Sequence, residues 1–346
     1  MELLNKESGS YFAASNTPDG FVSYFDQVFG GLERLYIIKG GSGVGKSRLM
    51  RDIAAAAEEW GLTVERFYCS LDPNSLDGII IPAMSVGFVD GTAPHIVDPT
   101  HPGATEEVID LSVFWDNAVL RKRKDEIVAI CTQKKKIFDS AIGYLAVAGK
   151  AEEQMHRVIA PAVNHGSVYC LAKELTNGIK TGEGYTETIR NFKGIGAGGY
   201  VEFGDFGVDN ELFVIKENYG IEFCVTEALR DIAKEKHCPV TISRSPLCPD
   251  KIDAIAFGGV TFALSSNMQG KEVCVKECMK QTLSQKELER AEELYKIKNS
   301  MINHAVDGFS RAMKLHFVLE DIYIGAMDFS QKEALTEKLT RQLFSD

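Results

Sequence analysis

The sequence has few of the features that mark membrane-spanning, secreted or nucleic-acid-binding proteins. No uncharged apolar run approaches the roughly 18 residues that a membrane-spanning helix needs. A basic segment followed by an apolar core, the pattern of a secretory signal, is absent from the N-terminus. Acidic residues outnumber basic ones, with a formal net charge of -11, whereas a nucleic-acid-binding surface is basic. We therefore expect neither a membrane span nor a nucleic-acid partner.

Cysteine is present but not in any pattern that indicates disulfides or metal. The eight cysteines are scattered, and no C-x-x-C pair occurs, which argues against a disulfide framework and a zinc site. Most lie among apolar residues, where free thiols are common, so we expect a reducing cytoplasm. With 346 residues, of which 45% are hydrophobic and 25% charged, the chain suits about two ordinary globular domains.

The most informative feature that is present is a phosphate-binding loop. Residues 35–47 read LYIIKGGSGVGKS, in which an apolar strand leads into the pattern G-x-x-x-x-G-K-[ST], and a helix-forming run follows over 48–60. Backbone N–H groups of such a loop and the positive N-terminus of the following helix bind phosphate. The predicted ligand is a nucleoside triphosphate. The predicted binding residues are Gly40, Gly41, Ser42, Gly43, Val44, Gly45, Lys46, Ser47 and Arg48.

Three side chains have predicted roles in binding Mg-ATP. Lys46 would contact the β- and γ-phosphates, and the Ser47 hydroxyl would be a ligand of Mg²⁺. Asp90 ends an apolar strand over 85–90 and has the form of a Walker-B carboxylate, which holds Mg²⁺ directly or through water. The cofactors expected are therefore ATP and Mg²⁺, with Ser47 and Asp90 as metal ligands.

An internal repeat provides a control within the same chain. The matching segments are 35–39 with 212–216, 51–54 with 230–233, and 71–79 with 247–255. Both copies must fold, so features that both retain are candidates for structure, and features that only the first retains are candidates for chemistry. At the loop, the aligned pairs are Gly40 with Glu217, Gly45 with Glu222, Lys46 with Phe223 and Ser47 with Cys224. Acidic residues would repel phosphate, so we expect the second copy to bind no nucleotide.

The same comparison sorts the acidic residues. The aligned pairs are Asp72 with Cys248, Asp90 with the neighbourhood of Ser266, and Asp77 with Asp253. Asp72 and Asp90 are lost together with the loop, which favours chemical roles for both. Asp72 fits either a base or water-positioning residue, or an Asx turn before Pro73. Asp77, which is retained, is expected at a turn or cap.

His95 and the segment 98–115 follow Asp90 closely and are further candidates for contact with the ligand. His95 is either a solvated loop residue or a contact of the ligand. The segment 98–115 is rich in Pro, His, Gly and acidic residues and has no clear partner in the second copy, so we expect it to fold over the site as a lid.

The predicted fold class is α/β, with tandem duplicated P-loop NTPase-like modules, each with a mainly parallel sheet and a helical hairpin arm. The predicted segments are an active module over 1–116, an arm over 117–188, a degenerate module over 189–270, and an arm over 271–346. The arms should pack on each other or on a second subunit, and they offer surfaces for a homo-oligomer or a protein partner. Basic runs at 121–124 and 134–136 are either solvated faces or the source of an arginine finger.

The segments 39–50, 69–82 and 89–95, with Pro102-Gly103 and 114–116, resemble a poorly characterised bacterial family of tandem P-loop ATPase-like and nucleotide-kinase-like proteins, common in Firmicutes. The resemblance covers the first half of the chain specifically and the second half loosely. It implies two P-loop modules with helical insertions and ATP binding. As far as the reaction is concerned, the resemblance implies nothing.

Three functions fit this sequence. The first is an ATPase whose hydrolysis drives a conformational change in the arms or in a partner. The second is a small-molecule kinase in which Asp72 is the base and the segment 98–115 excludes water. The third is a nucleotide-dependent regulator without catalysis. Gly91 stands where many ATPases have a catalytic glutamate, which weakens the motor interpretation, and ATP is preferred to GTP because no N-K-x-D tetrapeptide occurs.

Overall fold

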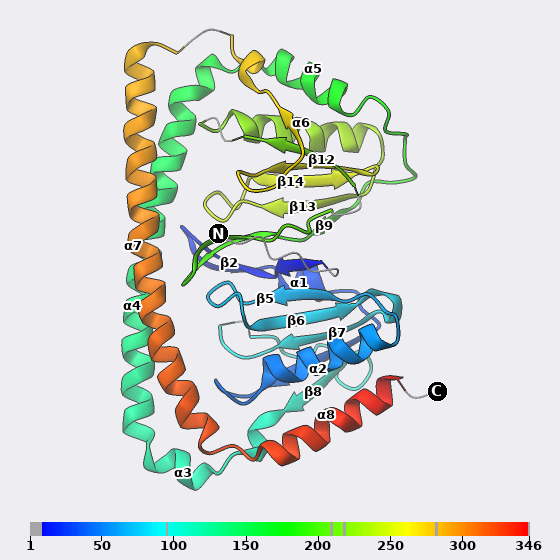
Figure 1. The fold of residues 1–346 in the computed structure, drawn as a ribbon, viewed down its shortest axis with the longest axis vertical. Coiled ribbons are helices and arrows are strands. Elements are labelled where there is room, and N and C mark those ends of the chain that lie inside the picture. The colour runs from blue at the N-terminus through cyan, green and yellow to red at the C-terminus, as the bar shows by residue number, and fades with distance from the viewer. Residues whose placement is uncertain (1–8, 95, 208–209, 217–218, 281–282, 345–346) are drawn as a thin grey trace.

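Two six-stranded sheets lie one above the other beside a pair of long helices in the computed structural model (Figure 1). The structure describes residues 9–344 except 95, 208–209, 217–218 and 281–282. Within these residues, no helix is both long and apolar enough to cross a membrane. The chain is a mixed α/β protein with helices packed around two separate sheets, which confirms the predicted α/β class.

The first sheet contains the strand that precedes the glycine-rich loop. In spatial order its strands are β1 (Ser10–Phe12), β5 (Glu65–Tyr68), β6 (Leu76–Ile81), β7 (Val86–Asp90), β4 (Arg34–Lys39) and β8 (Glu106–Asp110). All run parallel except β6, which is antiparallel to both neighbours. The central strands are nearly continuous apolar runs, as expected for a sheet that is covered on both faces.

The second sheet repeats this arrangement. Its order is β16 (Lys271–Val273), β12 (Glu211–Ile215), β15 (Val260–Leu264), β14 (Ile252–Phe257), β13 (Val240–Arg244) and β9 (Glu187–Ile189). Again one strand, β14, is antiparallel to both neighbours, and the rest are parallel. Two hairpins, β2–β3 (Ala14–Thr17, Gly20–Ser23) and β10–β11 (Lys193–Gly196, Gly199–Glu202), complete the strands. Figure 1 shows β2 between the two sheets.

In each half, one strand leads through a loop into a helix that covers the sheet: β4 in the first half and β12 in the second. These helices are α2 (Lys46–Glu59) in the first half and α6 (Ile221–Glu235) in the second. Each buries an apolar face at helical spacing, including Leu49, Ile53 and Ala57 of α2. Two further short helices are α1 (Phe25–Phe29), which packs on the first sheet, and α3 (Asn117–Lys122), which directly precedes the first long helix.

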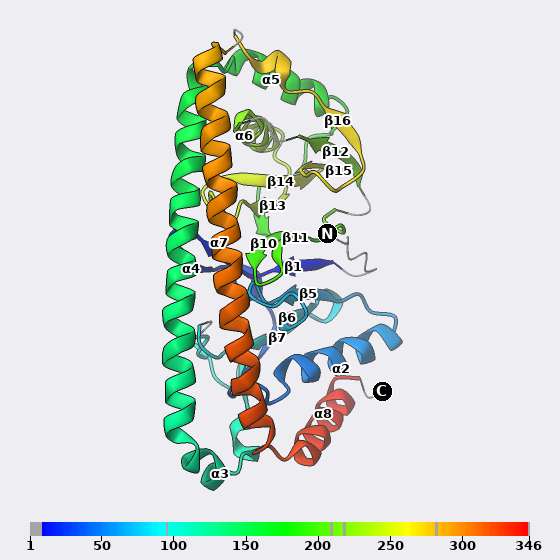
Figure 2. The same cartoon turned by 60° about the vertical axis from the view of Figure 1, so that its left-hand side comes forward.

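The arms are single long helices that pair with each other. They are α4 (Lys124–Ile159) and α7 (Gln285–Ile324), and they lie side by side along both sheets (Figures 1 and 2). A capping box, in which Ser284 and Glu287 exchange hydrogen bonds, starts α7. The expectation that the arms pack on each other is therefore confirmed. The predicted arrangement is one helical hairpin within each arm. In the structure each arm instead contributes one long helix, and the two long helices pair with each other.

The arms also exchange partners between the two halves. Helix α4 leaves the first sheet and continues to α5 (His165–Leu175), which packs on α6 of the second half. Helix α7 leaves the second sheet and continues to α8 (Phe329–Phe344), which packs on α2 of the first half. Figure 2 shows α8 beside α2, far along the chain from it. The helix layer of each half therefore includes a helix that follows the long helix of the other half.

Two other expectations are changed by the sheets. The segment 98–115 contributes β8 to the edge of the first sheet, beside β4, and only its end lies against the loop: a methyl group at Gly40 would lie 3.4 Å from Leu111 Cβ, and one at Gly41 would lie 3.3 Å from the Trp115 ring. It does have a counterpart, because β16 takes the same edge position in the second sheet. Asp77 lies inside β6 with 5% of its surface exposed, and not at a turn or a cap. Strand β16 lies in the range that the sequence assigned to the second arm.

Residues of α4 correspond to residues of α7 that lie a fixed number of positions later in the sequence. Ala141, Leu145 and Ala148 on α4 correspond to Ala305, Phe309 and Ala312 on α7; all six are buried, and all but Ala312 belong to one hydrophobic cluster. Small residues allow a close approach, since a methyl group at Gly308 would lie 2.8 Å from the Cβ of Ala141. The helix pair therefore has an approximate twofold relation between its halves.

A buried ionic cluster joins the two helices near the second sheet. The Lys298 ammonium lies 2.9 Å from Glu152 Oε2, and His156 Nε2 lies 3.1 Å from Glu152 Oε1. Glu152 is 4% exposed. Burial opposes ionisation of this carboxyl group, but the hydrogen bonds and charges of His156 and Lys298 outweigh that effect and lower its pKa.

We expect Lys298→Met to destabilise the protein. The substitution leaves the Glu152 carboxylate buried with only part of its compensation, and breaking a buried pair in this way costs about 3–5 kcal/mol. Urea denaturation would measure the free energy of unfolding. Lys296→Met, at an exposed position on the same helix turn, is the matched control and should change it by less than about 0.5 kcal/mol. Equal effects of the two substitutions would contradict a structural role for the pair.

Candidate functional site

The glycine-rich loop joins the end of β4 to the start of α2 at the C-terminal edge of the parallel strands. Gly43 and Gly45 have φ angles of 71° and 85°, and Gly40 has a φ of 150°, all of which favour glycine. None of the described side chains caps the start of α2, and no acidic residue lies in its first turn. The free N–H groups and the helix dipole therefore favour an anion at this point.

Lys46 folds back over the loop. Its Nζ donates hydrogen bonds to the carbonyl oxygens of Gly40 (2.9 Å) and Gly41 (2.7 Å), and it lies 3.4 Å from Asp90 Oδ2. The contact arises from strand register, because β4 and β7 are neighbours and Ile38 is paired with Asp90. The lysine and the carboxylate that the sequence singled out are thus brought together beside the loop.

Asp90 is held in place by the turn that follows β7. Its Oδ1 accepts a hydrogen bond from the backbone N–H of Thr92 (2.9 Å) and another from the Thr92 hydroxyl. Lys39 supports the same turn by donating to the Gly91 carbonyl oxygen (2.9 Å). Asp90 Oδ2 faces Lys46. The carboxylate is therefore oriented by its own turn, with one oxygen directed to the loop.

Ser47 and Asp72 have local partners. The Ser47 hydroxyl accepts a hydrogen bond from the Leu76 N–H (3.0 Å) and so connects α2 to β6. Asp72 Oδ1 accepts from the Asn74 N–H (3.0 Å), which is the Asx turn proposed as one of its two roles. None of the described contacts connects Asp72 with Lys46 or Asp90. Its role as a base stays a prediction, and His95 and Glu217 lie outside the described residues.

Within the described residues, no group of three His, Cys, Asp or Glu side chains could hold a metal ion by itself. A magnesium ion at Ser47 and Asp90 would therefore need further oxygen ligands from water or from a bound phosphate, which is the usual arrangement for Mg²⁺. The residues present fit this arrangement, since they are a hydroxyl and a carboxylate next to a phosphate-type loop.

The end of α7 and the start of α8 cover the loop from outside. Added methyl groups show how close the approach is. At Gly41 a methyl would lie 3.1 Å from the Tyr323 ring, and at Gly43 it would lie 2.8 Å from the backbone oxygen of Glu320. At Gly45 it would lie 3.4 Å from the Lys332 side chain. These arm residues were missed by the sequence analysis, because nothing in the helical pattern indicates that the second arm returns to the first half.

A groove of about 690 Å³ lies between α2 and α8, next to the loop. It is lined by Gly45, Arg48, Asp52, Phe329, Lys332, Glu333, Thr336, Glu337, Thr340 and Arg341. Lys332 is only 3% exposed, and its Nζ lies 3.7 Å from Asp52 Oδ2. Burial lowers the pKa of Lys332, while Asp52 opposes that shift. The groove thus adds a covered lysine and an aromatic ring to the surroundings of the loop.

The corresponding loop of the second half has lost the charges of the first. The C-terminal ends of α2 and α6 form the same hydrogen bonds, from Leu62 N–H to Ala57 and from Cys238 N–H to Ala233. Counted back from these ends, Glu222 takes the place of Lys46; counted forward from the left-handed N-caps Gly45 and Gly220, Ile221 takes it. By either count the position is not that of Phe223, which the sequence pairing put there.

The match of residues 51–54 with 230–233 is also out of register by the same count, which places Glu227 at the position of Arg51. Strand register makes a further correction, because Ile215 pairs with Leu264 as Ile38 pairs with Asp90. The counterpart of Asp90 is therefore Leu264 and not a residue near Ser266. The lysine and the carboxylate of the first loop are both replaced in the second.

The second loop supplies its own anion. The Glu222 carboxylate accepts a hydrogen bond from the Gly220 N–H (3.0 Å) at the start of α6. His156 of α4 packs on this loop, because a methyl group at Gly220 would lie 2.0 Å from its ring. Helices α4 and α7 thus end against one loop each, and only the first loop is left with a lysine.

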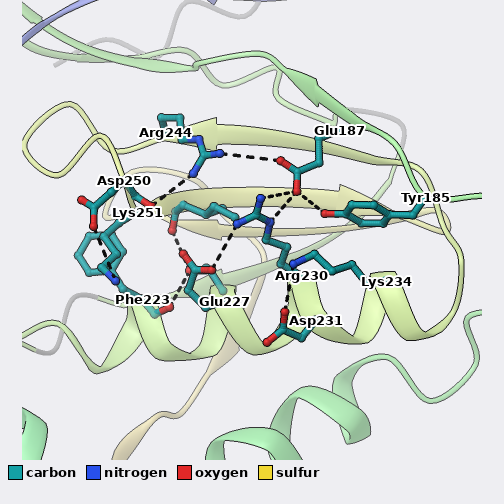
Figure 3. A network of polar contacts seen from close by, with 12 residues as sticks. Tyr185, Glu187, Phe223, Glu227, Arg230, Asp231, Lys234, Arg244, Asp250 and Lys251 are labelled. Atoms are coloured by element: carbon teal, nitrogen blue, oxygen red, sulfur yellow. Dashed lines mark hydrogen bonds and ion pairs between the residues drawn. The ribbon is translucent and has the colours of Figure 1, made fainter.

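The second half also contains a dense polar network, which joins α6 to the sheet (Figure 3). Arg230 Nε donates to Glu187 Oε1 (2.6 Å), and Arg244 lies 3.8 Å from Glu187 Oε2. Burial opposes ionisation of Glu187, but hydrogen bonds from Tyr185 and Arg230 outweigh it and lower its pKa. Because its charges compensate one another, we interpret this network as an anchor for the edge strand β9.

We expect Gly43→Ala to destabilise the protein more than Gly103→Ala. Both glycines have φ angles near 70–76°, where a side chain costs roughly 1–2 kcal/mol. Only at Gly43 would the added methyl group also meet a backbone atom of α7, whereas none lies within 4 Å at Gly103. Denaturation in urea should show an additional loss of about 1–3 kcal/mol for Gly43→Ala. Equal losses would mean that α7 does not press on the loop in solution.

Comparisons with protein-family models, with curated proteins and with solved structures find no match for this chain.

Proposed function

We propose that this chain is an ATPase that binds Mg-ATP at one site, on residues 40–48. The observation that carries the proposal is the convergence of Lys46 and Asp90, 3.4 Å apart, on a glycine-rich loop at the start of α2. A loop of this kind offers backbone N–H groups and a helix dipole to the phosphates, and the lysine adds a charge. The carboxylate is in position to bind the magnesium ion of the nucleotide.

The proposal includes a fold assignment: two P-loop NTPase-like modules in tandem, of which only the first binds nucleotide. The repeated strand order and the single antiparallel strand in each sheet support a duplication. Parallel strands that deliver their functional residues to the C-terminal edge also suit nucleotide binding. The second module is incompetent in this proposal, because Glu222 and Leu264 replace Lys46 and Asp90.

Among the alternatives, the phosphotransferase gains no support. It needs Asp72 as a base and the segment 98–115 as a lid, whereas Asp72 forms an Asx turn and only the end of that segment, at Leu111 and Trp115, lies against the loop. One observation favours a nucleotide-dependent regulator as the second candidate. The corner between α7 and α8 covers the loop, so a bound nucleotide would act directly on the arms. Release of ADP from Mg-ATP separates the two, since the regulator would bind without turnover.

We expect Lys46→Ala to abolish ATP binding, because the substitution removes the cation that faces the phosphates. Isothermal titration calorimetry of the wild type should give one ATP per chain. Glu222→Ala, at the equivalent position of the second loop, is the matched control and should still bind one ATP. Unchanged affinity in Lys46→Ala would refute the site, and two ATP molecules per chain would refute the incompetence of the second module.

We expect Asp90→Asn to weaken the binding of ATP with magnesium by about tenfold or more, without weakening the binding of metal-free ATP. The amide retains the shape of the side chain and its hydrogen bond to Thr92 but loses the negative charge. Titrations with magnesium and with EDTA measure the two affinities. Equal magnesium dependence in the wild type and the variant would remove Asp90 from the metal site.

A further inference from the structure

The last turns of α7 bring an acidic side chain to the phosphate-type loop. The backbone of Glu320 lies against Gly43, and its carboxyl group, whose pKa is lowered most by the hydrogen bond from His316, is also close enough to the Gly43 N–H for that group to lower it further. Lys46 is close enough to act on the charge of this carboxylate as well. The loop N–H group that would face a phosphate oxygen therefore already has an anionic side chain from the arm beside it.

Two basic side chains of the arms stand behind this acid. His316 Nε2 lies 3.5 Å from Glu320 Oε1, and His316 Nδ1 lies 3.3 Å from Lys134 Nζ and 3.5 Å from the Ser42 hydroxyl. An ammonium group can only donate, so the Nδ1 that faces Lys134 accepts, and the Nε2 that faces Glu320 carries a hydrogen. The contacts thus form a chain from α4, through α7, to the loop.

Lys134 is the member of the basic runs that the fold turns inward. Lys135 and Lys136 beside it are exposed, as are the basic residues of the run 121–124. Burial lowers the pKa of Lys134, while the charges of Cys131, Cys69 and Glu320 oppose that shift. An additional anion nearby would favour its charged form. The sequence suggests that a basic residue of these runs contacts the phosphates as an arginine finger. The residue of the two runs that the structure places for such a role is Lys134, a lysine and not an arginine.

The second half shows that the scaffold does not require an acid at this position. At the constant spacing of the two helices, Lys134 and Glu320 correspond to Lys298 and His156. The order of the acid and the histidine is reversed there, so that His156 faces the loop and Glu152 lies between the helices with Lys298. An acid therefore stands against the loop that has kept its lysine, and a histidine against the loop that has lost it.

We propose that the γ-phosphate of a bound nucleoside triphosphate replaces the Glu320 carboxylate at the Gly43 N–H and is then bound by His316 and Lys134. The inference rests on the proposed function, and it assigns three arm residues to the same site. Two anions at one N–H group repel each other, so carboxylate and phosphate exclude one another. A diphosphate lacks the group that competes. Nucleotide binding would then be selective for the triphosphate.

The exchange would also move the end of α7. The Glu320 backbone is in contact with Gly43, so its carboxylate cannot leave without a shift of the last turns or of the side chain. A helix of 40 residues spans about 60 Å, and α7 starts beside the second sheet. Displacement at the loop is therefore connected, through one helix, to the other half of the molecule.

The test compares the affinities of the full chain for Mg-ATP and Mg-ADP by calorimetry. Glu320→Gln removes the competing charge and should tighten ATP binding about tenfold, with less than a twofold effect on ADP. Lys134→Met should weaken ATP binding about tenfold and ADP binding less than twofold. The matched controls, Asp321→Asn and Lys135→Met, remove the same charges from exposed neighbouring positions and should leave both affinities within twofold.

The outcomes separate this inference from the proposed function. If the wild type binds ATP and Lys46→Ala does not, but Glu320→Gln leaves the affinity unchanged or weakens both nucleotides equally, only the present inference is overturned. An equal loss of ATP and ADP binding in Lys134→Met would show a structural role and overturn it too. If neither the wild type nor Glu320→Gln binds either nucleotide, the proposed function and this inference are both wrong.

A second measurement needs no variant. Hydrogen exchange of the wild-type amides over residues 316–328 should become faster with Mg-ATP than with Mg-ADP, because only the triphosphate would release the end of α7. Equal exchange rates with the two nucleotides, under conditions in which both are bound, would overturn the inference.

Discussion

The pairing of α4 with α7 is the interaction on which the rest of the molecule depends. Neither helix stays with the sheet that precedes it, and each carries a further helix to the opposite half, where α5 covers α6 and α8 covers α2. The two halves therefore cannot be completed separately. Small residues such as Ala141 and Gly308 allow the helices to approach closely, and the Glu152–Lys298 pair fixes their alignment in a buried position. A residue near the C-terminus thereby becomes a neighbour of a loop near residue 43.

The second constraint is electrostatic. A glycine-rich loop at a helix start gathers N–H groups that have no partner within the helix, and such groups favour an anion, whether it is a phosphate or a carboxylate of the protein. The two halves meet this requirement differently. In the second half the anion is Glu222, which belongs to the loop itself. In the first half the loop has a lysine, and the carboxylates come from β7 and α7, as Asp90 and Glu320. An anion from a distant element can be exchanged for a ligand, whereas one built into the loop cannot leave.

These differences also explain what the sequence could and could not predict. The strand, loop and helix around Lys46 follow from local pattern, and the position of Asp90 follows from a strand that must lie beside β4. The edge strand β16 has three residues, too few to show a period, so its relation to the segment 98–115 was not visible. Helical spacing shows that an arm has an apolar face, but not which helix covers it, and the exchange of arms was missed for that reason. Unless this exchange of arms is known, nothing in the sequence indicates that Glu320 and Lys332 lie near the loop.

The exchange of arms has a thermodynamic consequence. If an anion from α7 and a phosphate compete for one N–H group, the free energy of nucleotide binding includes the free energy of releasing the end of α7. That cost depends on how firmly α7 is held along its length, including at the Glu152–Lys298 pair, which lies near the other loop. If loosening α7 at its far end lowers that cost, it raises the affinity for nucleotide, and by linkage nucleotide then loosens α7 there by the same factor. In the proposed function the second half binds no nucleotide, but it can still influence the first, because it holds the start of the helix whose end lies against the loop.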